Sequence, residues 1–279
     1  MKQIAKRGGM EVITTAAKMQ NFRASLRGSV GFVPTMGALH EGHMSLIRQS
    51  IQENDNTIVS IYVNPTQFLP TEDLQKYSRQ LEKDIQTCKD AGADVVFAPQ
   101  TLYGRNEISI HAPKTAGYVL EGHFRPGHFD GVLQVVLKLF NITLPHRAYF
   151  GKKDAQQYIL IQKMVSDLFM PVSVIGLPTC RDSDGLAKSS RNVYLSSDQR
   201  QKALSIFKAL EKTKQLLRTG TELQQAVTQG RELLDVDRLQ YFCATDYALE
   251  PLHAYEKDNT LLLTAGFVGG TRLIDNMWL

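Results

Sequence analysis

The chain alternates between short apolar runs and amphipathic segments up to residue 180. The apolar runs have the length and β-branched content of buried strands, whereas the segments between them place apolar residues at helical spacing. The predicted strands begin at residue 31 and continue at 57–63, 94–99, 148–150 and 172–180, and the predicted helices cover 10–26, 39–47, 74–91 and 132–141. This alternation predicts an α/β fold with a Rossmann-like, mostly parallel sheet.

The pattern changes after residue 182, where charged amphipathic helices precede three further strands. Helices are predicted at 198–219 and 222–234, with Ser196 or Ser197 as the N-cap of the first and Gly220 as its stop signal. The strands are predicted at 239–245, 260–264 and 271–276. We therefore expect two domains, residues 1–182 with the parallel sheet and residues 183–279 with a smaller α+β fold.

The stretch from Gly31 to Ile47 predicts a strand, a tight turn and a helix start. His40, Gly42 and His43 fall in the first helical turn, where free backbone N–H groups and the positive end of the helix dipole favour an anion. Two imidazoles three residues apart point to nearly the same side of a helix. The stretch predicts a phosphate site, and the alternative is a glycine-containing loop with surface histidines.

Polar residues follow two other predicted strands, at the sheet edge where ligands bind in open parallel sheets. Asn64 and Gln67 carry amides that can donate to a carboxylate, although an ordinary Asx-Pro turn is an equal alternative. After the strand at 148–150, Gly151 permits close approach, Lys153 offers a positive charge, and Asp154 could orient a lysine, a ribose hydroxyl or a hydrated magnesium ion. The alternative for this lysine pair is a solvated helix face.

Two loops complete the candidate chemistry. Ser189, Ser190 and Arg191 could wrap a triphosphate with hydroxyls, N–H groups and a guanidinium fork, or they could form a surface loop. The loop at residues 120–131 is rich in Gly, His and Arg, as loops over a site often are. Metal binding by His123, His128 and Asp130 is conceivable. A structural or lid role is favoured, because no further cluster of ligands completes a metal site.

Composition narrows the class of protein. The 279 residues are 43% hydrophobic and 22% charged, with a net charge of +4 that is too small and too dispersed for a nucleic-acid binder. Cys88, Cys180 and Cys243 are far apart and lack metal-ligand spacing, which indicates reduced thiols. Residues 1–9 lack the apolar core of a signal peptide, and no stretch approaches the roughly 20 apolar residues of a membrane span. We expect a cytoplasmic protein without a membrane or nucleic-acid partner.

The motif His40-x-Gly42-His43 resembles the HxGH signature of the nucleotidylyltransferase superfamily. The flanking Val33-Pro34-Thr35-Met36-Gly37 is similar to the pantothenate synthetases, also called pantoate–beta-alanine ligases. The resemblance continues through Asn64-Pro65-Thr66-Gln67-Phe68, residues 120–141, the loop at 151–154 and Ser189-Ser190-Arg191-Asn192, and so spans essentially the whole chain. Five ordered motifs are far more specific than any one of them.

The resemblance implies roles for individual residues. His43, His40, Lys153 and Arg191 would be catalytic, with His43 the family's proton donor, and Gln67, Gln157 and Asn64 would bind pantoate. The chain departs from the family pattern at Lys152, where Glu is usual, at Lys188, where Met is frequent and whose contact with phosphate or solvent stays open, and at Cys180, where Val contacts adenine. The ATP-binding set would be Met36, Gly37, Ala38, Leu39, His40, Glu41, Gly42, His43, Gly151, Lys152, Lys153, Asp154, Cys180, Lys188, Ser189, Ser190 and Arg191.

The resemblance also implies a reaction. The carboxylate of (R)-pantoate would attack the α phosphorus of ATP, and the amine of beta-alanine would attack the resulting pantoyl adenylate, giving pantothenate, AMP and pyrophosphate. Mg²⁺ would bridge phosphate oxygens, with Asp154 as the one candidate protein ligand, and the protein would be a homodimer whose second domain closes over the nucleotide. Arg272, Asp275 and Asn276 match a family pattern, for which a structural ion pair is expected.

Three other functions compete with this interpretation. An adenylyl transferase acting on a phosphate substrate would place more cations beside His40, where this chain has the neutral Gln67 and Gln157. A non-catalytic nucleotide sensor would be favoured by loss of His43 or Lys153, and both are present. A nucleic-acid binder lacks its basic stripe with interleaved aromatic residues.

Overall fold

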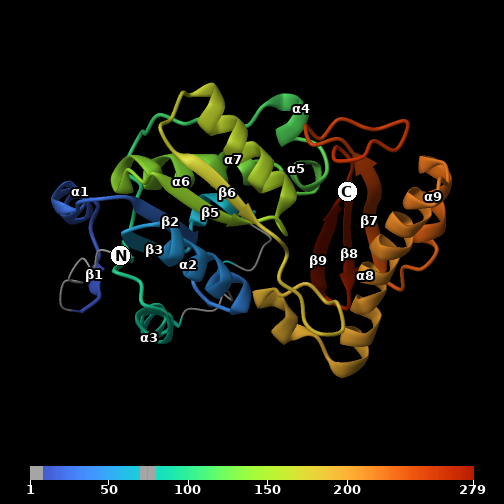
Figure 1. Ribbon diagram of the computed structural model, residues 1–279, viewed down its shortest axis with the longest axis horizontal. Coiled ribbons are helices and arrows are strands. Elements are labelled where there is room, and N and C mark those ends of the chain that lie inside the picture. The colour runs from blue at the N-terminus through green and yellow to red at the C-terminus, as the bar shows by residue number, and fades with distance from the viewer. Residues whose placement is uncertain (1–8, 70–73, 75–79) are drawn as a thin grey trace.

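A six-stranded parallel sheet organises the larger part of the molecule (Figure 1). The computed structural model describes residues 9–69, 74 and 80–279. All strand pairs of this sheet are parallel, in the order β1-β4-β3-β2-β5-β6. The strands are β1 Glu11–Ile13, β2 Val30–Thr35, β3 Asn56–Ile61, β4 Val95–Phe97, β5 Arg147–Gly151 and β6 Ser173–Leu177. The predicted parallel α/β fold is confirmed.

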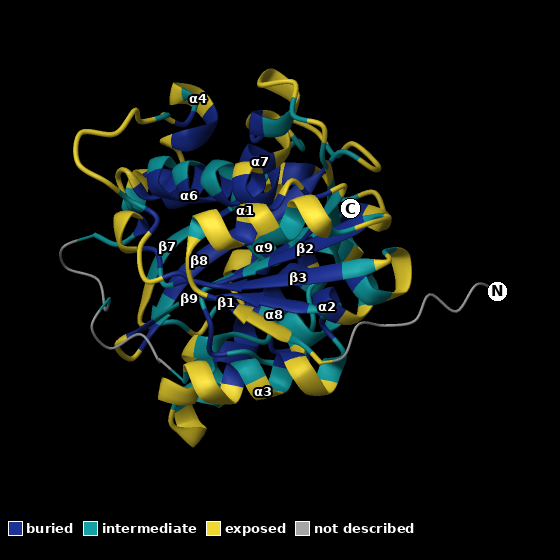
Figure 2. Ribbon diagram, turned by 90° about the vertical axis from the view of Figure 1, so that its left-hand side faces the viewer, coloured by how far each residue is buried: buried dark blue, intermediate teal, exposed yellow. Residues whose placement is uncertain are grey.

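Helices cover both faces of this sheet, as Figure 2 shows for α6 and α7 on one side and α3 on the other. Successive residues of a strand point to opposite faces, so Phe32 packs in the core with α1, α6 and α7, and Val33 packs in the core with α2 and α3. Burial on both faces explains why the strands are continuous apolar runs. The helices are α1 Ala16–Ser25, α2 Glu41–Glu53, α3 Leu81–Ala91, α4 Lys114–Gly117, α5 Glu121–Phe124, α6 His128–Thr143 and α7 Ala155–Asp167.

Three predicted elements differ from the structure. The helix predicted at residues 10–26 is wrong at its start, because residues 11–13 form an edge strand beside β4 and Thr15 caps a helix that begins at Ala16. Of the helix predicted at 74–91, residues 75–79 lie outside the described residues, and α3 begins at Leu81. The loop predicted at 120–131 contains α5 and the first turn of α6.

The C-terminal part forms a second, antiparallel sheet in the order β7-β8-β9, covered by α8 and α9 (Figure 1). Ser196 and Gln199 form a capping box at the start of α8, and Gly220, with φ +89°, follows its end. The elements are the 3₁₀ helix η2 Ser190–Tyr194, α8 Ser197–Arg218, α9 Leu223–Arg231, β7 Arg238–Thr245, β8 Leu261–Val268 and β9 Thr271–Trp278. The predicted α+β unit is confirmed, while its boundary at residue 183 stays a prediction.

The two sheets share a core. In β8, Leu262 packs in the core of α8 and α9, whereas Leu261 and Leu263 belong to the core of the parallel sheet. Successive side chains of β8 point to opposite faces, so this one strand packs against both units and joins them. Across residues 9–69, 74 and 80–279, no helix combines the length and the apolar character that crossing a bilayer requires.

Candidate active site

The predicted strand, turn and helix form at β2 and α2. The chain leaves β2 at Thr35, turns through Gly37 (φ +86°) and Ala38 (φ +51°), and enters α2 with His40 as the N-cap. The His40 backbone is extended, with φ −133° and ψ 177°, as an N-cap requires. The chemistry-bearing residues thus lie at the carboxyl end of a central strand.

His40 and His43 form a reciprocal capping box at the start of α2. The His40 Nδ1 accepts the Gly42 N–H at 3.1 Å, and the His43 Nδ1 accepts the His40 N–H at 3.3 Å. A Cβ at Gly42 would lie 2.8 Å from the His40 ring, so only glycine leaves room for this arrangement. Because each Nδ1 is an acceptor, each neutral ring carries its proton on Nε2. The two rings, with centroids 4.2 Å apart, therefore offer a pair of Nε2–H donors.

Burial keeps these imidazoles uncharged. Burial and the neighbouring His40 lower the pKa of His43 to about 3. The pKa of His40 is lowered by burial and by the positive charge of Lys153. At physiological pH both histidines are therefore neutral donors.

Several backbone N–H groups at this helix start have acceptors inside the protein, and the predicted anion site stays a prediction. The N–H groups of His40, Gly42 and His43 donate to the His43 ring, the His40 ring and the His40 carbonyl oxygen, respectively. The Ala38 and Leu39 N–H groups also have acceptors, both of them on one carboxylate of α3. The N–H groups of Ala38, Leu39, His40, Gly42 and His43 therefore have partners within the protein, whereas the Nε2–H groups of the two imidazoles remain able to bind a ligand.

Asn64 differs from its predicted role as a substrate ligand. Its side chain is only 1% exposed, and its Nδ2 donates to the Gln67 Oε1 and to the Gly131 carbonyl oxygen, each at 3.0 Å. Its Oδ1 accepts from the Tyr103 and Thr66 hydroxyls at 2.7 and 3.0 Å. These four bonds use the hydrogen-bonding capacity of the amide. Asn64 holds Gln67 in place.

Gln67 and Gln157 both line a cavity of about 240 Å³ below the histidines. Gln67 lies in the 3₁₀ helix η1 Pro65–Gln67, and its carbonyl oxygen is 2.7 Å from the Nδ1 of buried His128. The Gln157 amide, on α7, has no hydrogen-bond partner among the described residues. Apolar side chains of α6 form one part of the wall, namely Val132, Val135, Val136 and Leu139.

The two lysines after β5 point in different directions. The Lys153 Nζ lies 3.6 Å from the Asp154 Oδ1, and both side chains line the cavity. Burial raises the pKa of Asp154, but the positive charges of Lys153 and Arg191 outweigh this effect. The pKa is lowered overall, so the carboxyl is ionised. The Lys152 Nζ instead lies 4.7 Å from the centroid of the Trp278 ring. The Lys152 side chain thus packs on Trp278, and the place of Lys152 in the ATP-binding set stays a prediction.

The serine loop, which consists of Ser189, Ser190 and Arg191, reaches the same cavity from the other side. Ser189 caps η2 and accepts the Arg191 N–H at 3.2 Å, while the exposed Arg191 guanidinium has no partner among the described residues. Lys188 lines the cavity too, but its Nζ pairs with Asp182 at 2.6 Å. The sequence left open whether Lys188 contacts phosphate or solvent, and in the structure its partner is the carboxylate of Asp182.

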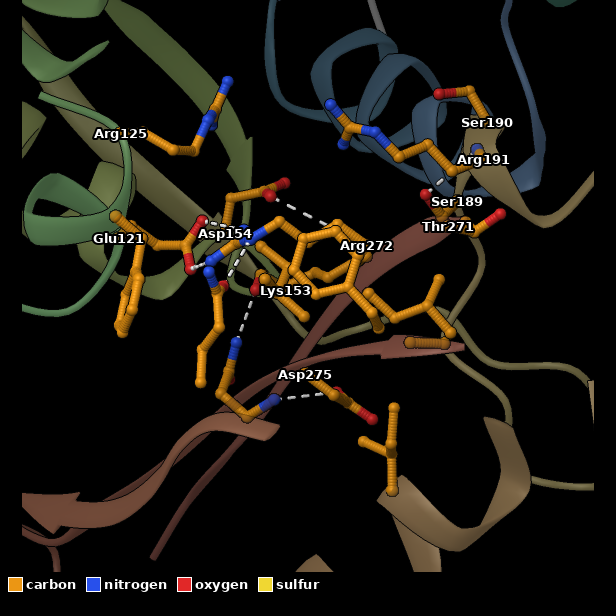
Figure 3. A pocket seen from close by; sticks show the side chains of 18 of the residues that line it. Glu121, Arg125, Lys153, Asp154, Ser189, Ser190, Arg191, Thr271, Arg272 and Asp275 are labelled. Carbon is orange, nitrogen blue, oxygen red and sulfur yellow. Dashed lines mark hydrogen bonds and ion pairs between the residues drawn. The ribbon is translucent and has the colours of Figure 1, made fainter. Parts of the chain in front are cut away.

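Most of the predicted residues meet at this cavity. A second cavity, of about 700 Å³, lies between the two sheets, and Lys153, Asp154 and the serine loop line both (Figure 3). The smaller cavity collects Met36, His40, Gly42, His43, Asn64, Gln67, Gly151, Lys153, Asp154, Gln157, Cys180, Lys188, Ser189, Ser190 and Arg191. Ala38 lines the larger one, whereas Gly37, Leu39, Glu41 and Lys152 line neither, and Glu41 pairs with Arg48.

The family follows from comparison with known proteins. Residues 11–278 match the family model described as pantoate-beta-alanine ligase. The chain belongs to this family. It is therefore an enzyme of pantothenate biosynthesis, as the sequence resemblance implied.

Relatives and solved structures agree with this assignment over the whole length. Pantothenate synthetase from Helicobacter pylori (strain G27) is 48% identical over 275 residues, covering 96% of this chain and 100% of the relative. The crystal structure of pantothenate synthetase from Thermus thermophilus has a TM-score of 0.92 and 40% identity, covering 96% and 99% of the two chains. Pantoate-beta-alanine ligase from Francisella tularensis, complexed with beta-gamma ATP and beta-alanine, has a TM-score of 0.78 and 37% identity, covering 96% and 97%.

Ion pairs connect the second sheet of the enzyme to the first unit, and one of them includes a wall residue, Glu121, that the sequence did not single out. Glu121, 7% exposed, accepts two bonds of 2.6 Å from Arg272 and one of 2.7 Å from the Tyr241 hydroxyl (Figure 3). Arg181 pairs with Asp275 at 2.6 Å. The ion-pair role expected for Arg272 and Asp275 is thus confirmed. Glu121 carried no sequence signal except its place in the loop at residues 120–131, which is rich in Gly, His and Arg.

The metal interpretation of residues 123–130 is not supported. His128 donates to the Gln67 carbonyl oxygen, and Asp130 contacts the His111 ring and the Ala112 N–H. Within the part of the chain that the structure describes, no three or more His, Cys, Asp or Glu side chains cluster in a way that could hold a metal. These contacts favour a structural role for His128 and Asp130.

Proposed function

We propose that the enzyme joins (R)-pantoate to beta-alanine through a pantoyl adenylate. A carboxylate oxygen of pantoate forms a bond to the α phosphorus of ATP, and the bond from that phosphorus to the bridging oxygen of pyrophosphate breaks. The amine of beta-alanine then bonds to the acyl carbon, AMP leaves with the shared oxygen, and the ammonium proton is released. The products are pantothenate, AMP and pyrophosphate.

The first step needs charge neutralisation rather than a general base. A carboxylic acid is ionised at neutral pH, so the nucleophile is ready but is repelled by the triphosphate. The proposed countercharges are Lys153 and Arg191, which face one cavity from two loops. The Nε2–H groups of His40 and His43 and the hydroxyls of Ser189 and Ser190 complete the donors. Preorganised donors of this kind stabilise charge that develops in a transition state.

The low pKa of His43 bears on its role. A group with a pKa of about 3 is neutral at pH 7. The neutral ring can still donate through Nε2–H, since its Nδ1 is occupied by the His40 N–H. We therefore assign His43 to hydrogen-bond stabilisation of the α phosphate, in place of proton transfer.

Pantoate would lie between the glutamines and the apolar wall of α6. The Gln67 amide is oriented by Asn64, and the Gln157 amide has no partner among the described residues, so both can bind hydroxyl and carboxylate groups. Valines of α6 suit the branched carbon body of the acid. Beta-alanine would approach from the larger cavity, because the two cavities meet at Lys153, Asp154 and Gln157.

Magnesium fits this site only as an ion held mainly by phosphate. Mg²⁺ commonly binds through substrate phosphates and one or two carboxylates, and Asp154 is an ionised carboxylate at the cavity. When bound, the ion neutralises charge on phosphate oxygens. Residues 183–279 as a lid domain, the homodimer and the cytoplasmic location likewise stay predictions.

The observation that carries the proposal is the convergence of the histidine pair, Lys153, the serine loop and the two glutamines on one cavity. The test is exchange of labelled pyrophosphate into ATP, with and without pantoate. We expect exchange that requires pantoate and does not require beta-alanine. No exchange in the presence of pantoate would contradict this function, and would favour a nucleotide sensor or an adenylyl transferase with a different acceptor.

A further inference from the structure

A buried carboxylate lies directly beneath the histidine turn. Asp84, in the first turn of α3, is 2% exposed. Its Oδ2 accepts the Ala38 N–H at 2.8 Å, and its Oδ1 accepts the Leu39 N–H at 2.9 Å. No Lys, Arg or His side chain of the described residues pairs with it. A buried charge without a cation is costly, and here two N–H groups and the positive end of α3 are what stabilise it.

The turn that Asp84 holds has an unusual backbone. Gly37 and Ala38 are consecutive residues at positive φ, +86° and +51°, and alanine disfavours that region because of its Cβ. In this turn the consecutive N–H groups of Ala38 and Leu39 face the same side and share one anion. The Asp84 carboxylate occupies that position. It therefore compensates for the strain at Ala38 and selects this turn over others.

The turn in turn determines where α2 begins. His40 follows Leu39 directly, and its extended backbone places its ring under the Gly42 N–H and its own N–H under the His43 ring. A different turn would move the N-cap, and with it the tautomers and directions of both imidazoles. Asp84 also saturates the N–H groups that a phosphate could otherwise use.

We propose that Asp84 is a positioning residue for His40 and His43. It acts through the backbone of Ala38 and Leu39 and touches no ligand. This inference rests on the proposed adenylate chemistry for its kinetic consequence, although not for its structural one. A role confined to stability would predict a lower melting temperature with the two imidazoles unchanged.

The first test is D84N, which keeps the shape of the side chain. An amide has one acceptor oxygen, so its NH₂ group would face one of the two N–H groups of the turn and repel it. We expect kcat for pantoate-dependent pyrophosphate exchange to fall about 100-fold, and KM for pantoate to change less than about threefold. D90N is the matched control, because Asp90 lies on the same helix, is exposed and bonds Gln86. Equal kcat values in D84N and D90N would overturn the proposal.

Two further measurements separate positioning from folding. A38G should restore part of the activity of D84N, since glycine adopts φ +51° without a Cβ penalty. D84N added to H43A should lower kcat little beyond H43A alone, because both changes act on the same donor. Absence of rescue together with a full additional loss in H43A would contradict a role through the histidines.

The deciding readout does not need activity. Nitrogen-15 spectra of the imidazoles, assigned with H40Q and H43Q, should show proton-bearing Nε2 and bare Nδ1 for both rings in the wild type. In D84N we expect this pattern to be lost or averaged, and in A38G/D84N to return in part. An unchanged pattern in D84N would refute the inference, whatever happens to the rate. Wild-type enzyme without pantoate-dependent exchange would refute the proposed function instead.

Discussion

Asn276 of β9 holds the backbone of Lys153, the lysine that faces the smaller cavity. Its Nδ2 donates to the Lys153 carbonyl oxygen at 2.5 Å and to that of Lys152 at 3.0 Å. On the same strand, Arg272 holds Glu121 and Asp275 holds Arg181. One strand of the C-terminal sheet therefore supports three segments that carry or adjoin site residues. The second unit is therefore part of the active-site framework.

The first prediction concerns this strand. N276A should lower kcat for pyrophosphate exchange about 10- to 100-fold, because the Lys153 ammonium loses its backbone support. N141A is the control, since the exposed Asn141 bonds only a carbonyl oxygen of its own helix. Exchange kinetics of both variants, beside their melting temperatures, give the comparison. Wild-type kcat in N276A would show that Lys153 needs no such support.

A second prediction follows from the neutral state of His43. H43A should reduce kcat about 100- to 1000-fold, the range seen when one donor to a developing charge is removed. H43Q should retain clearly more activity than H43A, because glutamine is also a neutral N–H donor. If His43 were a proton donor, the two variants would be equally impaired.

The same pKa predicts how stability depends on pH. Burial lowers the pKa of His43 to about 3, far below its unfolded value, so the unfolded chain binds a proton first as pH falls. The free energy of unfolding should therefore decrease as pH falls below about 6.5, towards 3. Urea denaturation of wild type and H43Q between pH 4 and 7 measures this, and the wild type should lose more stability. Parallel curves would contradict a buried neutral imidazole.

A fourth prediction tests the revised role of Asn64. N64A and Q67A should both raise KM for pantoate, since the Asn64 Nδ2 donates to the Gln67 Oε1 at 3.0 Å. In the N64A/Q67A double variant the effects should not multiply, because both act on one amide. Multiplied effects would mean that Asn64 binds substrate independently.

The fifth prediction concerns the Glu121–Arg272 pair. E121Q should destabilise the protein by about 3 kcal/mol, the cost of leaving a largely buried charge without its partner. Replacing both members with E121Q/R272M should cost less than E121Q alone. Urea denaturation of the three proteins measures these differences, and a neutral E121Q would show that the pair adds nothing to stability.

Much of the fold could be predicted because the parallel strands are buried on both faces. Phe32 and Val33 face opposite cores and are both apolar. Such a continuous apolar run can be recognised as a strand from the sequence alone, before its neighbouring strands are known. The three-residue strand at Glu11–Ile13 is too short to interrupt a helical spacing, and its pairing with β4 is not local. The turn and the histidine pair could be predicted because Pro34, Gly37 and Gly42 mark the end of the strand and the start of the helix.

The missed features depend on contacts between distant segments. Asp84 looks like any charge on an amphipathic helix until Ala38 and Leu39, more than 40 residues earlier, donate to it. The sequence also leaves the direction of the Lys152 side chain undefined, because its partner Trp278 lies near the other end of the chain. The bonds that make Asn64 a support come likewise from Tyr103 and Gly131.

The central claim is that the carboxylate of pantoate attacks the α phosphorus of ATP in the smaller cavity. Pantoate labelled with ¹⁸O in its carboxylate tests it directly, with the products of one complete reaction with beta-alanine analysed by mass spectrometry. The account predicts one ¹⁸O atom in each AMP and none in pyrophosphate. Label in inorganic phosphate, or AMP without label, would contradict it.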